Sequence, residues 1–276
     1  MRSIAVINQK GGVGKTTSSV NLAAALAEAG RSVCLLDLDP QAHASLHFGV
    51  SAHGDSPSMY EVLCGDVSLE QARQTVPNNS LISVVPSNLD LAAAELELAG
   101  EVGREMILKD RLDEETERFD YLILDCPPSL GVLTLNALVA VREVFLPLQP
   151  HFLALHGLSK LLRTVEVVSR RLNSRLRLTG VMLCMYDSNT RLAAEVSTDI
   201  DEFFHASKGS RDFFQQARFF ETRIRRNIRL AEAPSFGQSI MEYAPESNGA
   251  ADYRSLAEEV IAQESEILSS NLSRAA

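Results

Sequence analysis

Eight residues near the amino terminus have the types and spacing of a phosphate-binding loop. They follow the apolar run 4–7, open an alanine-rich helical pattern and read Lys10-Gly11-Gly12-Val13-Gly14-Lys15-Thr16-Thr17. Glycines let backbone N–H groups turn around phosphate oxygens, and the helix behind them presents roughly half a positive charge. Lys15 is expected to reach the β- and γ-phosphates of ATP, and the Thr16 hydroxyl to bind Mg²⁺. The coincidence of strand, loop, Lys-Thr pair and helix favours this interpretation over a glycine-rich turn without a ligand.

Three aspartates stand where apolar runs end, which is where an open parallel sheet binds its ligands. Asp37 and Asp39 close the run 33–36, and Asp125 closes the run 121–124. Because Mg²⁺ keeps several waters and takes few protein ligands, Asp125 is expected to hold its water shell. Alternation along an extended chain sends Asp37 and Asp39 to the same side, where one could support the metal and the other position the attacking water. The alternative is a pair of solvated acids in a turn.

The rest of the sequence predicts the scaffold that brings these side chains together. Five runs are apolar at every position, as expected of strands buried on both faces: 4–7, 33–36, 121–124, 144–146 and 181–185. Helical patterns cover 15–29, which Gly30 would end, as well as 154–173 and 249–269. The fold class is therefore α/β, with a mostly parallel central sheet flanked by helices on both faces. Without a repeat or a long linker, residues 1–276 are expected to form a single domain.

Composition narrows the class of protein further. No stretch approaches the roughly 20 apolar residues of a membrane-spanning helix, and the amino terminus lacks a signal-peptide layout, so a cytoplasmic location is expected. His43 and His47 have no further metal ligand beside them and are expected at the surface. Reduced thiols, and neither a zinc site nor a disulfide framework, are expected of the four widely spaced cysteines, which are Cys34, Cys64, Cys126 and Cys184.

These motifs together resemble the deviant Walker ATPases, and among them the ParA/Soj partitioning proteins. The segments that carry the resemblance are Lys10-Gly-Gly-Val-Gly-Lys15-Thr-Thr, Asp37-Leu-Asp39-Pro-Gln41, Asp125-Cys-Pro-Pro-Ser-Leu-Gly131 and Asn227-Ile-Arg-Leu-Ala-Glu-Ala-Pro-Ser-Phe-Gly237. The resemblance implies a P-loop NTPase fold and an ATP-dependent sandwich dimer in which Lys10 reaches the partner's phosphates. Two stacked triphosphates would otherwise repel each other.

The same resemblance assigns roles to the site residues. Asp39 matches the residue that orients the hydrolytic water, and Asp37 and Asp125 match the acids that support Mg²⁺. The 227 to 235 segment matches the part that lines the adenine, with Asn227 and Pro234 as its nucleotide-binding residues. Some positions depart from the family pattern: Arg225 replaces a frequent Pro, His156 a frequent Glu, and Asn189 a frequent Arg that is one possible DNA contact.

Nonspecific DNA binding by the ATP-bound dimer is a further implication, and it requires a local basic patch. The formal net charge of -10 opposes any general attraction to nucleic acid. The first candidate patch, which a dimer would double, contains Arg218, Arg223, Arg225, Arg226 and Arg229. A second candidate follows the 154–173 helix and contains Arg163, Arg170, Arg171 and Arg175. The alternative for both sets is a solvated face that offsets an acidic surface.

The resulting hypothesis is a switch in which Mg-ATP closes a homodimer, the dimer associates with the nucleoid, and a ParB-like partner promotes slow hydrolysis. No helix-turn-helix domain is expected, because such a domain needs about a hundred residues ahead of the loop. The cargo could be a chromosome, a plasmid or a protein cluster. A MinD-type membrane-cycling protein is disfavoured by the acidic 258–266 segment. A metabolic P-loop enzyme is disfavoured by Lys10, since a lysine that acts in trans has no evident use there.

Overall fold

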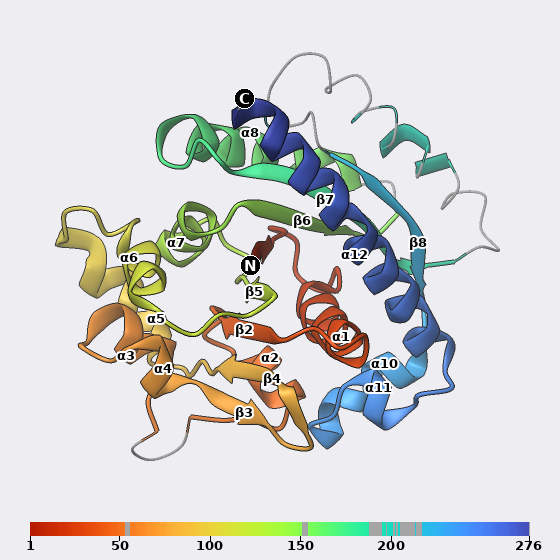
Figure 1. The fold of residues 1–276 in the computed structure, drawn as a ribbon, viewed down its shortest axis with the longest axis horizontal. Coiled ribbons are helices and arrows are strands. Elements are labelled where there is room, and N and C mark those ends of the chain that lie inside the picture. The colour runs from red at the N-terminus through yellow and green to blue at the C-terminus, as the bar shows by residue number, and fades with distance from the viewer. Residues whose placement is uncertain are drawn as a thin grey trace.

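Eight strands form one sheet in the computed structural model, which describes residues 1–52, 56–150, 154–187 and 217–275 together with residues 195, 196, 198–200, 202, 204 and 213. The strand order is β3-β4-β2-β5-β1-β6-β7-β8 (Figure 1). Only the β3–β4 pair is antiparallel among these strands. The strands are β1 (Arg2–Val6), β2 (Val33–Asp37), β3 (Gln74–Val76), β4 (Asn79–Val85), β5 (Tyr121–Asp125), β6 (Glu143–Leu148), β7 (Arg177–Tyr186) and β8 (Phe219–Arg225).

Helices cover both faces of the sheet, so the predicted fold class is confirmed. One face carries α1 (Lys15–Glu28), α2 (His43–His47), α10 (Ile228–Glu232), η3 (Ala233–Phe236), α11 (Ile240–Tyr243) and α12 (Asn248–Ala275). The other carries α3 (Met59–Cys64), α4 (Leu69–Ala72), α5 (Leu91–Glu97), η1 (Leu98–Gly100), α6 (Ile107–Glu114), α7 (Val132–Ala140) and α8 (Ala154–Arg171). Two hydrophobic cores result, one on each side of the sheet.

Alternation along the strands feeds both cores. In β1, Ile4 and Val6 pack toward α1 and α12, whereas Ala5, together with Ile7 just after the strand, packs toward α7 and α8. This two-sided burial explains why the central strands have no polar alternation. The five apolar runs are confirmed as β1, β2, β5, β6 and β7.

The predicted helices are also found, with adjusted ends. The 15–29 pattern is α1, and Gly30 follows it with φ +80°, a conformation that glycine adopts without strain. The 154–173 and 249–269 patterns are α8 and α12, the latter continuing to Ala275. The assignment of the whole chain to one domain stays a prediction.

Because the parallel strands share one direction, the carboxyl ends of β1, β2 and β5 lie together. Val6 is paired with Asp125, and Asp125 with Asp37. The loop that starts after β1 and both aspartates therefore meet at one edge of the sheet, as the sequence predicts.

Candidate nucleotide-binding site

The loop between β1 and α1 is held in shape by contacts on both sides. Asn8 donates from Nδ2 to the Pro147 carbonyl at 2.7 Å and accepts from the Lys10 backbone N–H at Oδ1 at 2.9 Å. Gly14 has φ +93°, and a Cβ there would lie 3.4 Å from Cβ of Cys184 on β7. The bonds of Asn8 thus tie the loop to β6, and such preorganisation favours tight phosphate binding.

The two lysines of the loop occupy different environments. Lys15, which opens α1, is 7% exposed, and its Nζ donates to the Lys10 carbonyl at 3.3 Å. Burial lowers the pKa of Lys15 despite the attraction of Asp125 and Asp39. Lys10 is exposed at the rim, beside the exposed Gly11 and Gly12. One lysine therefore faces the interior of the site, and the other lies where a neighbouring molecule could be met.

Asp125 is joined to α1 by two hydroxyl groups. Thr16 Oγ1 donates to Asp125 Oδ2 at 2.8 Å, and Ser19 Oγ donates to Oδ1 at 2.7 Å. Complete burial and the repulsion of Asp37 raise the pKa of Asp125 to about 7. The sequence analysis missed Ser19, although it lies three residues after Thr16 and so on the same face of the helix.

Asp37 is likewise enclosed, and its two oxygens accept from the protein itself. Oδ1 accepts from the Asp39 backbone N–H at 3.2 Å, and Oδ2 accepts from the N–H and the hydroxyl of Ser45 at 2.8 and 2.7 Å. Burial raises the pKa of Asp37 to about 6, even though these donors favour the charged form. Asp37 thus shapes the turn that carries Asp39, and Ser45 is a second residue that the sequence analysis missed.

Asp39 follows that turn and is 9% exposed. Its Oδ1 accepts from the Gln41 backbone N–H at 3.0 Å, and its charge contributes to the environment of Lys15. The structure therefore brings Lys15, Asp39 and Asp125 together in one site, as expected.

The donor set suits Mg²⁺. A hydroxyl and a carboxylate oxygen are ligands that this ion takes while keeping its waters. Burial is the main cause of the raised pKa values of Asp37 and Asp125, and the attraction of Lys15 only partly opposes it at Asp125. Within the described ranges there is no group of three or more His, Cys, Asp and Glu residues arranged for a metal ion, so a site built wholly from such side chains is not found there.

The predicted adenine segment begins where β8 ends. Asn227 caps α10, and its Oδ1 accepts from the Arg229 backbone N–H at 2.8 Å. Pro234 is half-buried in η3. β8 is the neighbour of β7, whose Cys184 lies close to Gly14 of the phosphate loop, so the segment lies beyond the same strand ends. Their contact with a base stays a prediction.

The arginines of the first candidate patch are largely engaged. Arg225 binds Asp252 of α12 through both its guanidinium and its backbone N–H, at 2.6 and 2.9 Å. A proline at this position could not donate the second bond. Arg229 pairs with Glu232 at 2.8 Å, and Arg223 donates to the carbonyls of Phe220 and Glu221. Arg218 precedes these residues in sequence and Arg226 lies among them, and both are exposed. Asn189 lies outside the described residues.

The histidine prediction is wrong for His47. His43 is exposed, but His47 is 1% exposed because α2 packs its inner side against η3. Burial lowers the pKa of His47 to about 4, so it is neutral at physiological pH. The four cysteines are free thiols, as expected.

Among the described residues, no helix has the length and apolarity that crossing a bilayer requires.

Comparison with known proteins gives consistent matches. Residues 1–178 match a family model described as an AAA domain. Over 263 residues the chain is 40% identical to the chromosome-partitioning ATPase Soj of Treponema pallidum, covering 95% of this chain and 98% of that protein. It is 40% identical over 260 residues to the chromosome partitioning protein ParA of Myxococcus xanthus, with 94% and 88% covered. A solved structure, cobyrinic acid a,c-diamide synthase from Mycobacterium smegmatis with bound ATP analog and magnesium, is 36% identical with a TM-score of 0.79 over 95% of each chain.

Proposed function

This chain belongs to the Soj/ParA family of partitioning ATPases, and from that premise we propose that it is a Mg-ATP-driven switch whose closed state is a DNA-bound homodimer. It hydrolyses ATP, with Mg²⁺ as the cofactor. The proposal adds dimerisation, nonspecific DNA binding, and a ParB-like protein that stimulates turnover. The closed state would be associated with the nucleoid in the cytoplasm.

The contrast between the two loop lysines carries this proposal. Lys15 is enclosed and suited to the β- and γ-phosphates of its own nucleotide, whereas Lys10 is exposed at the rim. A second copy facing this edge would bring its own Lys10 toward the first copy's phosphates, which lowers the repulsion between two stacked triphosphates.

The site residues divide the chemistry among them. Thr16 and Asp125 would hold Mg²⁺, which supplies charge neutralisation at the β- and γ-phosphates when bound. Lys15 adds a positive charge from the protein interior. Asp39 orients the attacking water, and the hydrogen bonds that Asp37 accepts from the N–H groups of Asp39 and Ser45 fix the turn on which Asp39 stands. Such positioning without a strong base is consistent with slow intrinsic turnover and with stimulation by a partner.

The carboxyl-terminal helix favours this function over membrane cycling. Glu259 accepts from the N–H groups of Glu221 and Thr222 at 2.8 and 2.7 Å, and Glu264 pairs with Arg31 at 3.1 Å. These acids of α12 are committed to the body of the protein, and acidic residues are repelled by anionic lipid.

The dimer is tested by sedimentation of an Asp39→Ala variant with saturating Mg-ATP. We expect a dimer with ATP and a monomer without it, together with a loss of hydrolysis. Lys10→Ala in the same background is the matched control, because it should bind ATP through Lys15 and remain monomeric. A monomer in the Asp39→Ala variant, or hydrolysis at the wild-type rate, would refute the proposal.

A second candidate function comes from the Mycobacterium smegmatis structure, whose name describes a small-molecule synthase. Such an enzyme would couple ATP hydrolysis to modification of a small substrate. Assaying ATPase activity without any such substrate separates the two: a partitioning switch hydrolyses ATP alone and is stimulated by DNA and a partner protein, whereas a synthase needs its substrate. Identifying the stimulating partner would also decide between a DNA cargo and a protein-cluster cargo.

A further inference from the structure

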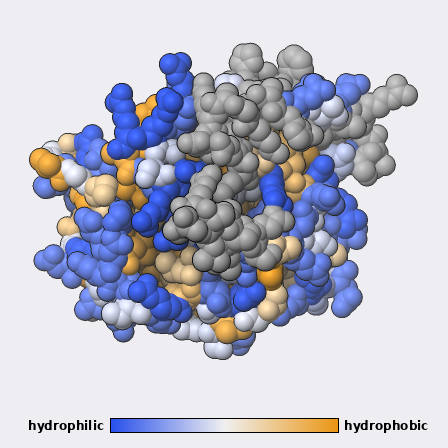
Figure 2. All heavy atoms as spheres, turned by 45° about the horizontal axis from the view of Figure 1, so that its top comes forward, coloured by the Kyte–Doolittle hydropathy of each residue, from blue (hydrophilic) through white to orange (hydrophobic). Residues whose placement is uncertain are grey.

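Helix α8 has one face in the core and one in solvent. Its inner face packs into the core beneath the sheet through Leu158, Leu161, Leu162, Val165 and Val168. Its outer face carries basic residues at helical spacing. They are Lys160, Arg163, Arg170 and Arg171, followed after the helix by Arg175. We call these five residues the α8 basic face. Figure 2 shows projecting hydrophilic side chains at the upper left, where α8 lies in Figure 1.

This face holds a concentrated and poorly compensated charge. Between Lys160 and Arg175 there are five cations and one carboxylate, in a chain whose net charge is -10. The carboxylate, Glu166, is 8% exposed and lies 3.8 Å from Arg170, which is 76% exposed. Within the described residues, no carboxylate pairs with the other four cations of the face.

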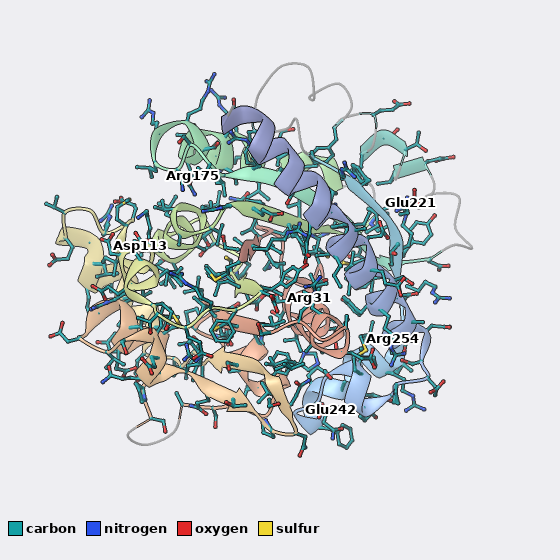
Figure 3. The ribbon with its side chains drawn as sticks, in the orientation of Figure 1. Arg31, Asp113, Arg175, Glu221, Glu242 and Arg254 are labelled. Atoms are coloured by element: carbon teal, nitrogen blue, oxygen red, sulfur yellow. The ribbon has the colours of Figure 1, made fainter. Side chains whose placement is uncertain are left out.

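Two further observations extend the contrast. Lys109 on α6 lies near Arg175 but is paired with Asp113, so it adds little to the charge of the face, and Figure 3 places Arg175 at the end of α8 on the α6 side. In the first candidate patch, by comparison, Arg225 and Arg229 are already paired with Asp252 and Glu232. Uncompensated guanidinium groups are therefore more numerous on α8.

The length of the face matches a polyanion with regularly spaced charges. At 1.5 Å per residue, the helical part from Lys160 to Arg171 spans about 17 Å. On one strand of B-DNA a phosphate recurs about every 3.4 Å along the axis, so about five phosphates lie along that length. Guanidinium groups also match phosphate geometry in a bidentate manner.

We propose that the α8 basic face is a surface that binds the DNA phosphate backbone without regard to sequence. The proposal rests on the proposed function for its ligand and adds the surface that holds it. A lipid bilayer is a poorer match, because the exposed apolar residues here are only Val167 and Leu172 among the described ones, and the apolar side of the helix is buried in the core.

The position of α8 is compatible with dimerisation. The nucleotide site lies at the carboxyl ends of β1, β2 and β5, whereas α8 covers a face of the sheet and ends next to the start of β7. Two copies that meet at the nucleotide edge would leave both α8 basic faces open, so ATP-dependent closure would double the charge presented to one duplex.

The test measures DNA binding by the closed protein as a function of salt. In the Asp39→Ala background with Mg-ATP, the anisotropy of a labelled random-sequence duplex gives Kd between 50 and 200 mM salt. Replacing Arg163, Arg170, Arg171 and Arg175 with Ala should lower the slope of log K against log salt by about 0.9 per lost phosphate contact, or about 3.6 per protomer. Sedimentation with Mg-ATP should still give a dimer.

Three matched variants make the result specific. Lys at the same four positions should keep the wild-type slope, which rules out a folding defect as the cause. Ala at Arg31, Arg104, Arg118 and Arg254 removes the same charge elsewhere and should leave the slope within about one unit. Ala at Arg223, Arg226 and Arg229 tests the first candidate patch.

Several results would overturn the proposal. An unchanged slope in the α8 variant, with loss of binding in the Arg223/Arg226/Arg229 variant, would place the DNA surface on the first patch. A wild-type dimer that does not retain DNA would remove the ligand while leaving the ATP switch intact. Binding to vesicles with 30% phosphatidylserine that is lost in the α8 variant, without DNA binding, would make the face a lipid contact.

Discussion

Charged side chains are buried both at the amino ends of the strands, the amino edge of the sheet, and at their carboxyl ends, the carboxyl edge. The two edges differ in whether the buried charge has a partner of opposite sign. At the amino edge, Arg2 donates to both carboxylate oxygens of Glu143 at 2.8 and 2.7 Å, to the Val260 carbonyl and to Gln263. Thr179 adds a further bond to Glu143 at 2.7 Å. At the carboxyl edge, Asp37, Asp125 and Lys15 are enclosed without an ion pair among the described residues.

The direction of the pKa shifts expresses this difference. Burial alone would lower the pKa of Arg2, but the hydrogen bonds and charge of Glu143 raise it above its ordinary value. At the other edge burial prevails, since the pKa of Asp125 rises to about 7 and that of Lys15 falls. Where the protein itself supplies the opposite charge to a buried group, the pair is part of the fold. A buried charged group without such a partner marks a candidate ligand site.

The largest expected effect is the loss of activity in Lys15→Ala. Removing the enclosed positive charge should lower kcat/KM for ATP by about a thousandfold, because no other group of the loop neutralises the β- and γ-phosphates from inside. Denaturation of the nucleotide-free protein should show no loss of stability, since the lysine is desolvated without an ion pair. A large destabilisation would contradict the comparison between the edges.

At the amino edge, Glu143→Gln should have the opposite profile. The variant leaves the Arg2 guanidinium buried without the negative charge of its partner. This should lower the free energy of unfolding by about 3 kcal/mol. Urea denaturation measures this loss, and the KM for ATP serves as the control that should stay within twofold of wild type. A shift in KM with unchanged stability would place the pair in the nucleotide site instead.

The pH dependence of stability should separate the edges further. Asp37 and Asp125 have folded pKa values of about 6 and about 7, above the value of about 3.9 in an unfolded chain. The folded protein therefore holds extra protons between about pH 4 and pH 7, so this contribution to stability falls as pH rises through that window. In EDTA and without nucleotide, Asp125→Asn should be more stable than wild type at pH 8, on the order of 1–2 kcal/mol, and the difference should vanish near pH 4. A variant less stable than wild type at pH 8 would show that the Asp125 charge is compensated internally.

The smallest expected effect is that of Ser45→Ala. Loss of the hydroxyl removes one bond to Asp37 and the acceptor for the Ser87 backbone N–H at 3.1 Å. We expect kcat to fall about fivefold, equivalent to about 1 kcal/mol, with little change in KM, because Asp37 positions the turn of Asp39 and does not bind ATP itself. Ser45→Thr, which restores the hydroxyl, is the control. An effect on KM alone would assign Ser45 to nucleotide binding.

The elements that could be predicted from the sequence are those defined by a short local motif or by strands buried on both faces. The phosphate loop and the strands β1, β2, β5, β6 and β7 are continuous in sequence, so their patterns are legible. β8 is not predicted because it lies at the edge of the sheet and buries only Phe220 and Ile224, so the sequence Phe-Phe-Glu-Thr-Arg-Ile-Arg is recognisable mainly by its basic residues. β4 was also missed, because its first three residues are polar or exposed and only its last four are buried.

The site residues that were missed depend on tertiary contacts. Ser45 reaches Asp37 after a turn in which Ala42 adopts φ +54°. This left-handed conformation is rare for alanine and cannot be predicted from the sequence. The burial of His47 likewise follows from the packing of α2 against η3, two segments far apart in sequence. Ser19 is the exception, since its spacing from Thr16 was sufficient to place it beside Asp125.

The position of β1 has a consequence for biosynthesis. This strand is synthesised before its neighbours β5 and β6, and Arg2 gains its partners only from Glu143, Val260 and Gln263. The phosphate loop therefore cannot acquire β6 and β7 as neighbours until the residues up to Tyr186 have been translated, and the amino edge closes only when α12 has left the exit tunnel. A nascent chain that stalls before residue 260 would leave the apolar face that α12 covers exposed, which makes it a substrate for chaperones and proteases.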